Sequence, residues 1–261
     1  MTPNDQQKRY DLFGWDYAIH SRLTDDEVAW HVKFAHEASG PVLGLACGTG
    51  RLLCRIAEAG FDVTGLDLSD TMLDIARKYV SQLPSETRSR VTLVLGDMSD
   101  FRLGRDFGLI TLADNSFRVL TERDAHLACL RRVREHLRAD GVFLMTERRF
   151  DPALYPDGRR TFDYGDPFVN PDSGDAVRRK LELRLADDHK WLSGAFTYEV
   201  THPDGSVEAV RCPLDAPILS TDDYLALFAE AGLAAQPCAD YTEHPADGSE
   251  RLTCFVCRPA G

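Results

Sequence analysis

Short apolar runs alternate with helical patterns between Pro41 and Ala139. The apolar runs have the length of single strands, and the segments between them repeat apolar residues at helical spacing. Runs without polar interruption are typical of parallel strands that are buried on both faces. The expected strands are Val42–Ala46, Phe61–Asp67, Val91–Gly96, Phe107–Ala113 and Val142–Glu147. This order predicts an α/β protein with a doubly wound, mostly parallel sheet built from βαβ units.

Helical patterns fill the spaces between these runs. In the last of them, Thr121 is the expected N-cap and Gly141 lies beyond the expected end. Apolar residues on one face recur every three or four positions, as in helices that pack on a sheet. The predicted helices are Leu52–Ala59, Thr71–Gln82 and Thr121–Leu137, preceded by Tyr10–Ala18 and Asp25–Glu37 near the N-terminus.

The pattern changes after the fifth run. Pro, Gly and Asp are frequent in Asp151–Asp172, which predicts a long loop. Alternating patterns follow, and a Pro-Asp-Gly turn at Pro203–Gly205 favours an antiparallel ribbon. The alternating segments are Val177–Leu185, Trp191–Val200 and Val207–Cys212. A helix at Thr221–Ala231 and strands near Leu233–Asp240 and Leu252–Val256 would complete a seven-stranded sheet.

Three regions are therefore expected. Residues 1–40 form an N-terminal helical segment, residues 41–150 and 218–261 form the main sheet domain, and residues 151–217 form an antiparallel cap inserted into it. An antiparallel ribbon leaves strand edges that need covering, so we expect the cap to make subunit contacts in a homo-oligomer.

Charge and composition narrow the classes of partner. The chain of 261 residues has 30 basic and 42 acidic residues, a formal charge of -12 that disfavours a nucleic-acid partner. No apolar run approaches the roughly 20 residues that span a bilayer. Met1–Arg9 is polar and lacks the apolar stretch of a secretory signal, so a cytoplasmic protein is expected. Cys254 and Cys257 have no second pair at the spacing of a metal site, so no metal is expected.

Candidate chemistry gathers at three strand ends. The segment Leu43-Gly44-Leu45-Ala46-Cys47-Gly48-Thr49-Gly50 follows the first strand and opens a helix, Asp67 ends the second strand, and Gly96-Asp97-Met98 ends the third. Open sheets bind ligands at the carboxyl ends of neighbouring strands. The loop alone is also compatible with a tight turn, and its G-x-x-x-G-x-G order differs from the G-x-G-x-x-G of dinucleotide sites, which disfavours a nicotinamide enzyme. Together the three elements predict a ligand site.

These motifs resemble the glycine loop, ribose acid and adenine-side motif of class I S-adenosylmethionine-dependent methyltransferases. The resemblance implies a Rossmann-like domain over 41–150 and 218–261, a lid over 1–40, and S-adenosyl-L-methionine as cofactor, with S-adenosyl-L-homocysteine as product. The family usually has an acidic residue at the position of Gly44, so contacts to the methionyl ammonium would come partly from backbone carbonyls near Ala46 and Ala113. The implied cofactor-binding residues are Tyr17, Arg22, Ala46, Cys47, Gly48, Gly50, Asp67, Leu68, Met72, Asp97, Met98 and Ala113.

Two regions are candidates for aligning the methyl acceptor. The stretch Asp114-Asn115-Ser116-Phe117 resembles, without its prolines, an element of amine-methylating members of the class. Asn115 would hold the amine and Phe117 would face the cationic product, although Phe117 packed beneath a loop is an alternative. Tyr10-Asp11 and Asp16-Tyr17 resemble lid elements of small-molecule enzymes, with Tyr10 and Tyr17 as candidate proton acceptors and Arg22 as partner of the methionyl carboxylate. A core-facing helical stripe is the alternative for the tyrosines.

The whole pattern is similar to N-methyltransferases of actinobacterial antibiotic pathways, of the amino-sugar or lincosamide type. That resemblance implies a small-molecule amine as acceptor, and a prolyl ring nitrogen in the lincosamide case. A small-molecule O-methyltransferase would share every cofactor residue and differ only in its acceptor pocket. A protein that binds the cofactor without turnover remains a further alternative.

Overall fold

The computed structural model describes residues 3–261, which form two compact units. One unit contains the described residues up to Arg22 together with Phe150–Ile218, and the other contains Leu23–Arg149 and Leu219–Gly261. The two N-terminal helices fall in different units, α1 (Pro3–His20) in the first and α2 (Asp25–Ala38) in the second. We call these the cap unit and the sheet unit.

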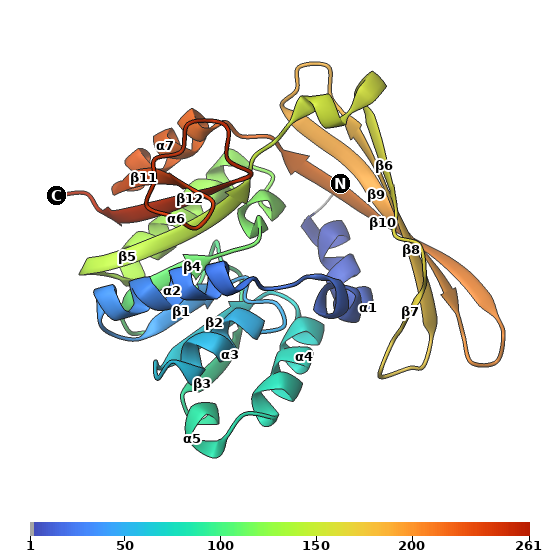
Figure 1. Ribbon diagram of the computed structural model, residues 1–261, viewed down its shortest axis with the longest axis horizontal. Coiled ribbons are helices and arrows are strands. Elements are labelled where there is room, and N and C mark those ends of the chain that lie inside the picture. The colour runs from blue at the N-terminus through green and yellow to red at the C-terminus, as the bar shows by residue number, and fades with distance from the viewer. Residues whose placement is uncertain (1–2) are drawn as a thin grey trace. The chain divides into compact units, whose positions relative to one another are not determined.

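The sheet unit is built on seven strands in the order β11-β12-β5-β4-β1-β2-β3 (Figure 1). Strands β5, β4, β1, β2 and β3 are parallel, and β12 is antiparallel to both of its neighbours. This arrangement confirms the predicted α/β class. The strands are β1 (Val42–Leu45), β2 (Val63–Asp67), β3 (Val91–Leu95), β4 (Phe107–Leu112), β5 (Leu137–Arg148), β11 (Leu233–Ala239) and β12 (Leu252–Pro259).

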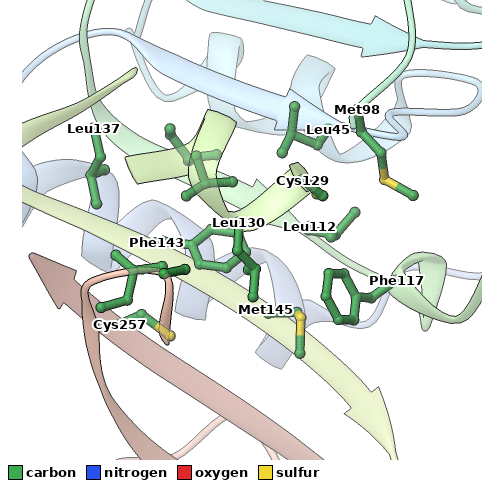
Figure 2. Close-up of a cluster of buried hydrophobic side chains, with 14 of the residues drawn as sticks. Leu45, Met98, Leu112, Phe117, Cys129, Leu130, Leu137, Phe143, Met145 and Cys257 are labelled. Carbon is green, nitrogen blue, oxygen red and sulfur yellow. The ribbon is translucent and has the colours of Figure 1, made fainter. Parts of the chain in front are cut away.

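Helices cover both faces of this sheet, which explains why its central strands are apolar throughout. Leu43 and Leu45 of β1 belong to a cluster with α6 and α7, whereas Val42 belongs to a second cluster with α2 and α3. Successive strand residues point to opposite faces, so both faces need apolar side chains. Figure 2 shows part of the first cluster. The remaining helices of this unit are α3 (Arg51–Glu58), α4 (Asp70–Ser81), α5 (Ser85–Arg88), α6 (Arg123–His136) and α7 (Thr221–Glu230).

The cap unit is an antiparallel sheet with strand order β10-β9-β8-β6, and β7 also pairs with β8. Buried and exposed residues alternate along β8, as expected of a sheet with one buried face. The Phe13 ring of α1 stacks on Tyr198 of β9 with a centroid distance of 3.7 Å, so α1 supplies part of this unit's core. The strands are β6 (Arg159–Asp163), β7 (Phe168–Val169), β8 (Ala176–Leu185), β9 (Trp191–Thr201) and β10 (Val207–Pro217).

Several expected elements differ from the structure. The predicted loop Asp151–Asp172 contains β6, β7 and the short 3-10 helices η2 (Pro152–Leu154) and η3 (Pro156–Gly158). Local composition indicates a loop there, but β8 supplies the hydrogen-bonding partner that makes strands of these residues. The first helix spans Pro3–His20 rather than Tyr10–Ala18, with non-helical angles at Phe13. Helix α5 was not predicted.

The expected limits of the helix before β5 were also wrong. Glu122, not Thr121, is the N-cap of α6, and Leu137 already pairs with Phe107 of β4. Gly141 therefore lies within β5 and does not end a helix. A Cβ on Gly141 would lie 2.9 Å from the Gly108 carbonyl oxygen, so close packing of β4 against β5 requires glycine. Within residues 3–261, none of the helices has the length and apolar character needed to cross a membrane.

Candidate active site

The loop between β1 and α3 has a backbone conformation suited to close contact with a ligand. Ala46, Gly48 and Gly50 all have positive φ, at 46°, 55° and 72°. Only glycine adopts this region freely, so Ala46 holds local strain of a kind that gathers at binding sites. Gly50 is the N-cap of α3, and the amide of Cys47 donates to the Leu66 carbonyl at 3.0 Å. The loop is thereby tied to the end of β2.

Asp67 connects the two strand ends through its carboxylate. Oδ2 accepts a hydrogen bond from the Gly48 amide at 2.6 Å, and Oδ1 accepts one from the Ser69 amide at 2.9 Å. The Ser69 hydroxyl in turn accepts from the amide of Met72, which lies buried in the first turn of α4. Asp67 itself is 9% exposed. Charge-assisted hydrogen bonds to Asp67 therefore tie the glycine loop to the start of α4.

The ends of β2 and β3 add an exposed apolar side chain and a second acid. Leu68 is 51% exposed although it directly follows a fully buried strand. Asp97, after β3, is exposed, and its Oδ1 accepts from both the amide and the hydroxyl of Ser99 at 2.7 Å. Met98 is buried and points into the cluster drawn in Figure 2. The ends of β1, β2 and β3, which are neighbours in the sheet, thus bring the predicted loop, Asp67 and the segment Gly96-Asp97-Met98 to one edge.

These residues fit a cofactor that has a ribose, an adenine and an amino-acid tail. A carboxylate such as that of Asp67 is a natural acceptor for ribose hydroxyls. The exposed Leu68 side chain offers an apolar face to a flat base, and Asp97 offers an acceptor for an amino group. The assignments of Ala46, Cys47, Gly48, Gly50, Met72 and Met98 to the cofactor stay predictions, and each of these residues lies in this loop or in the helix and strand end beside it.

The loop after β4 was the first candidate region for the acceptor. Ala113 is followed by Asp114 and Asn115, which have positive φ of 55° and 60°. Their amides donate to Thr146 of β5, and the Asn115 side-chain oxygen accepts from the Arg148 amide. These bonds hold the loop against β5. Asn115 is therefore occupied in shaping the turn, and its contact to the acceptor stays a prediction.

Phe117 does not have the position that the sequence pattern suggested. Phe117 is the buried residue of the 3-10 helix η1 (Ser116–Val119) and is 0% exposed. Its ring lies 4.5 Å from His126 and 6.1 Å from Tyr224 between centroids, and Figure 2 shows it inside the apolar cluster. A fully buried ring has no face left for a methylated cation. The expected contact of Phe117 with the acceptor is therefore corrected to a core role.

A buried ion pair, which the sequence did not predict, lies beneath this loop. Arg118 Nε is 2.6 Å from Glu147 Oε2, and the Glu147 side chain is 3% exposed. Burial raises the pKa of Glu147 to about 7, while the Arg118 charge opposes that shift and the nearby Asp114 adds to it. Tyr224 also contacts this pair. Arg118 donates to the Arg148 carbonyl as well, so the pair fixes the end of β5 to the acceptor-side loop.

The Glu147→Gln variant should change how stability depends on pH. Folding raises the Glu147 pKa from its ordinary value near 4.5 to about 7. Between pH 4.5 and pH 7 the folded state therefore holds a proton on Glu147 that the unfolded state has lost. The wild-type unfolding free energy consequently falls as pH rises through this range. The variant lacks this loss, so its unfolding free energy relative to wild type should rise by up to about 3 kcal/mol between pH 5 and pH 8. Urea unfolding at both pH values measures this, with Glu199→Gln, at an exposed position of β9, as control. Equal pH slopes in wild type and Glu147→Gln would contradict the expectation.

Tyr10, Tyr17 and Arg22 belong to the cap unit. Tyr10 and Tyr17 are half-buried on α1, and Arg22 is exposed. The Asp11 side chain lies outside the described residues. Roles of these residues toward the cofactor or the acceptor stay predictions.

The same helix carries a buried charge network that the sequence did not indicate. Asp16 is 0% exposed, and its carboxylate pairs with Arg179 of β8 and accepts from the Tyr198 hydroxyl at 2.9 Å. Arg9 Nε donates to the same hydroxyl at 2.9 Å, and His20 Nδ1 lies 3.0 Å from Asp16 Oδ1. Asp16 was read only as part of a motif, because its partners Arg179 and Tyr198 lie more than 160 residues away in the chain.

The cysteines and histidines do not assemble into a metal site within residues 3–261. Cys254 and Cys257 lie on β12 as thiols, in keeping with the predicted pair on a late strand. Burial raises the pKa of Cys254 to about 12, so its thiol stays protonated at neutral pH.

Comparisons with known proteins agree with this geometry. Residues 42–141 match the model of a methyltransferase domain. A dTDP-3-amino-3,4,6-trideoxy-alpha-D-glucopyranose N,N-dimethyltransferase of Streptomyces venezuelae is 30% identical over 245 residues, which cover 90% of this chain and 93% of the relative. A dTDP-4-amino-2,3,4,6-tetradeoxy-D-glucose N,N-dimethyltransferase of Saccharopolyspora spinosa is 28% identical over 230 residues and 84% of each chain.

Solved structures share the fold. An S-adenosylmethionine-dependent methyltransferase from Clostridium acetobutylicum ATCC 824 superposes with a TM-score of 0.76 at 20% identity, over 97% of this chain and 99% of that one. The loop, the two acids and the near full-length relative together place the chain among the S-adenosylmethionine-dependent methyltransferases, to which it belongs. S-adenosylmethionine is its cofactor, as the sequence motifs predicted.

Proposed function

We propose that this methyltransferase transfers the methyl group of S-adenosylmethionine to an amino nitrogen of a small molecule, with an amino sugar as the favoured acceptor. The observation that carries the proposal is the similarity to the Streptomyces venezuelae relative, which is an amino-sugar N,N-dimethyltransferase by name. Its similarity extends over 90% of this chain and therefore reaches beyond the cofactor-binding core. A prolyl ring nitrogen, suggested by the lincosamide resemblance, is the second acceptor to test.

Methyl transfer mainly requires the protein to align the acceptor nitrogen with the methyl group. The cofactor supplies a methyl group on a sulfonium, which an amine attacks in line. The chain's own part is to hold the acceptor nitrogen in place, exclude water and avoid offering a competing nucleophile. Cys47 lies in the glycine loop, and burial raises the pKa of its thiol well above the usual value. Cys47 therefore stays a thiol, which is a poor nucleophile compared with a neutral amine.

The acceptor amine must lose its proton before it attacks. Tyr10 and Tyr17 on α1 are the proposed proton acceptors, and both side chains are half-buried. Water serves instead if the amine has a low pKa. A Tyr17→Phe variant that keeps wild-type turnover with every acceptor would remove Tyr17 from this role.

The test is a matched acceptor panel assayed by mass spectrometry with purified protein. It compares a nucleotide-linked amino sugar, the same sugar with hydroxyl in place of the amine, and a prolyl compound with a free ring nitrogen. We expect methyl transfer to the amino sugar and none to its hydroxyl counterpart. Release of S-adenosylhomocysteine should match the methyl groups transferred.

Each outcome separates the alternatives. Transfer to the hydroxyl sugar would overturn the proposal in favour of an O-methyltransferase. Transfer only to the prolyl compound would keep N-methylation and reject the amino sugar. Tight cofactor binding without transfer to any acceptor in the panel would favour a protein that binds the cofactor without turnover.

A further inference from the structure

The cofactor's amino-acid end lacks its usual acidic partner in this chain. Gly44 lies in β1 where the family usually has an acid. A Cβ at Gly44 would lie 2.8 Å from Leu53 Cδ2, and one at the paired Gly65 would lie 2.5 Å from Leu53 Cδ1. Leu53 therefore fills the space above both glycines. The position of the missing carboxylate is closed, and the cofactor's ammonium needs a negative partner from another element.

Helix α2 brings a different carboxylate to this edge of the sheet. It ends at Ala38, shortly before β1 begins at Val42, so its first turn lies near the carboxyl ends of the strands (Figure 1). Trp30 and Phe34 of α2 pack in the cluster with Leu53 on this face. The chain thus places Glu27, in the first turn of α2, on the side of the glycine loop.

The surroundings of Glu27 are those of a charged binding group. Glu27 is 8% exposed, and the Tyr241 hydroxyl donates a hydrogen bond to its carboxylate. The charges that act on it come from Asp114, at the end of β4, and from Arg51, directly after the glycine loop. These two residues flank the strand ends at which the methionyl tail was expected near Ala46 and Ala113. Burial, followed by the Asp114 charge, raises the pKa of Glu27 above its ordinary value.

A cation beside these carboxylates would relieve a real electrostatic cost. The Asp114 charge disfavours the ionised form of the buried Glu27, and an ammonium close to both carboxylates would be stabilised by each of them. Arg51 supplies one positive charge nearby, and its Nε donates to Thr49 Oγ1 at 3.2 Å. One guanidinium against two carboxylates leaves the site net negative.

We propose that Glu27 of α2 binds the ammonium of the cofactor's methionyl end and replaces the acid that the family usually has at the position of Gly44. Asp114 contributes to the same negative site from the end of β4. This inference concerns the cofactor alone and does not depend on which acceptor the enzyme methylates.

A structural role for Glu27 has to be separated from this one. The Thr24 hydroxyl accepts from the Glu27 amide at 3.1 Å, so Thr24 and Glu27 have the spacing of a capping box at the start of α2. Glutamine also serves in that motif. The Glu27→Gln variant therefore keeps the N-terminal capping of α2 and removes only the negative charge.

The experiment is calorimetric binding to wild type, Glu27→Gln and Glu37→Gln with three ligands. Glu37 is an exposed glutamate of the same helix and serves as the matched control. S-adenosylhomocysteine has both ammonium and carboxylate, decarboxylated S-adenosylhomocysteine has the ammonium only, and 5′-methylthioadenosine has neither, while all three are neutral at sulfur. The thermal unfolding temperature of each variant without ligand shows whether the N-terminal capping of α2 is intact.

We expect Glu27→Gln to weaken the first two ligands by about 10- to 100-fold, as for a lost hydrogen bond to a charged group. Binding of 5′-methylthioadenosine should change less than about twofold, and Glu37→Gln should match wild type with all three ligands. Equal weakening of all ligands, or no weakening of any, would overturn the role of Glu27. Weakening of S-adenosylhomocysteine alone would show that the ammonium by itself does not depend on Glu27, and would equally overturn the role. Failure of wild type to bind any ligand would instead contradict the cofactor assignment.

Discussion

Replacing Asp67 with alanine is expected to weaken binding of S-adenosylmethionine and S-adenosylhomocysteine by about 10- to 150-fold. Hydrogen bonds to a charged group contribute about 1.5 to 3 kcal/mol, and each 1.4 kcal/mol is tenfold in affinity. The carboxylate also accepts from the Gly48 and Ser69 amides, so its removal should release the glycine loop in addition to the predicted ribose contact. Calorimetry with both ligands measures the effect.

A modified ligand separates these two contributions. An S-adenosylhomocysteine analogue without the ribose 2′ and 3′ hydroxyls should bind wild type more weakly than the parent ligand. The Asp67→Ala variant should bind parent and analogue equally, because the hydroxyls have lost their acceptor. If the analogue loses the same affinity in both proteins, Asp67 shapes the loop without contacting the ribose. The control is Asp70→Ala, which changes an exposed aspartate in the first turn of α4.

Replacing Asp16 with asparagine is expected to destabilise the cap unit by about 3 to 5 kcal/mol, the usual cost of breaking a buried ion pair. Asparagine keeps the shape of the side chain but removes the charge between Arg9 and Arg179. Arg179 is 9% exposed and would keep its charge without a counter-ion in the same network. Hydrogen exchange should show lost protection in α1, β8 and β9, with much smaller changes in the sheet unit. Asp187→Asn, an exposed aspartate of the same unit, should have little effect.

A second variant tests the electrostatic explanation. Adding Arg179→Met to Asp16→Asn removes one of the stranded cations and leaves an apolar side chain of similar length. The double variant should be less destabilised than the sum of its single changes, since the residues act through one shared interaction. Additive losses would show that the Asp16 charge does not act through Arg179. The result also bears on the predicted lid residues, because Tyr10 and Tyr17 lie on the helix that Asp16 anchors.

The main sheet and the cofactor loop were predictable because their signals are local. Strands that are buried on both faces read as short apolar runs, and each run in β1, β2 and β4 is buried throughout. The glycines of the loop have the positive φ that only their residue type adopts freely. Asp67 was found because it ends a strand, and its position follows from the chain direction alone.

Other features depend on partners that are distant in the chain. The strand β6 was read as loop, since β8 provides the pairing that local composition conceals. Phe117 follows a polar loop and was expected to face a ligand, yet α6 and α7 supply His126 and Tyr224 to enclose it. Glu147 ends an apolar run without any sign in the sequence that Arg118 would neutralise it.

Glu27 and Asp16 show which features follow from the sequence and which depend on the tertiary structure. Thr24-x-x-Glu27 indicates a helix start, and the structure has that start, but only the packing of α2 on the sheet brings the carboxylate toward Asp114 and Arg51. The motif that contains Asp16 is visible in the sequence, whereas its burial depends on Arg179 of β8 and Tyr198 of β9. Periodicity and residue type act over a few neighbours and therefore determine the class of fold and the loop that binds the cofactor. Burial, pKa and charge pairing depend on side chains that fold together from remote segments, so the tertiary structure alone decides which acids are buried and which groups they hold.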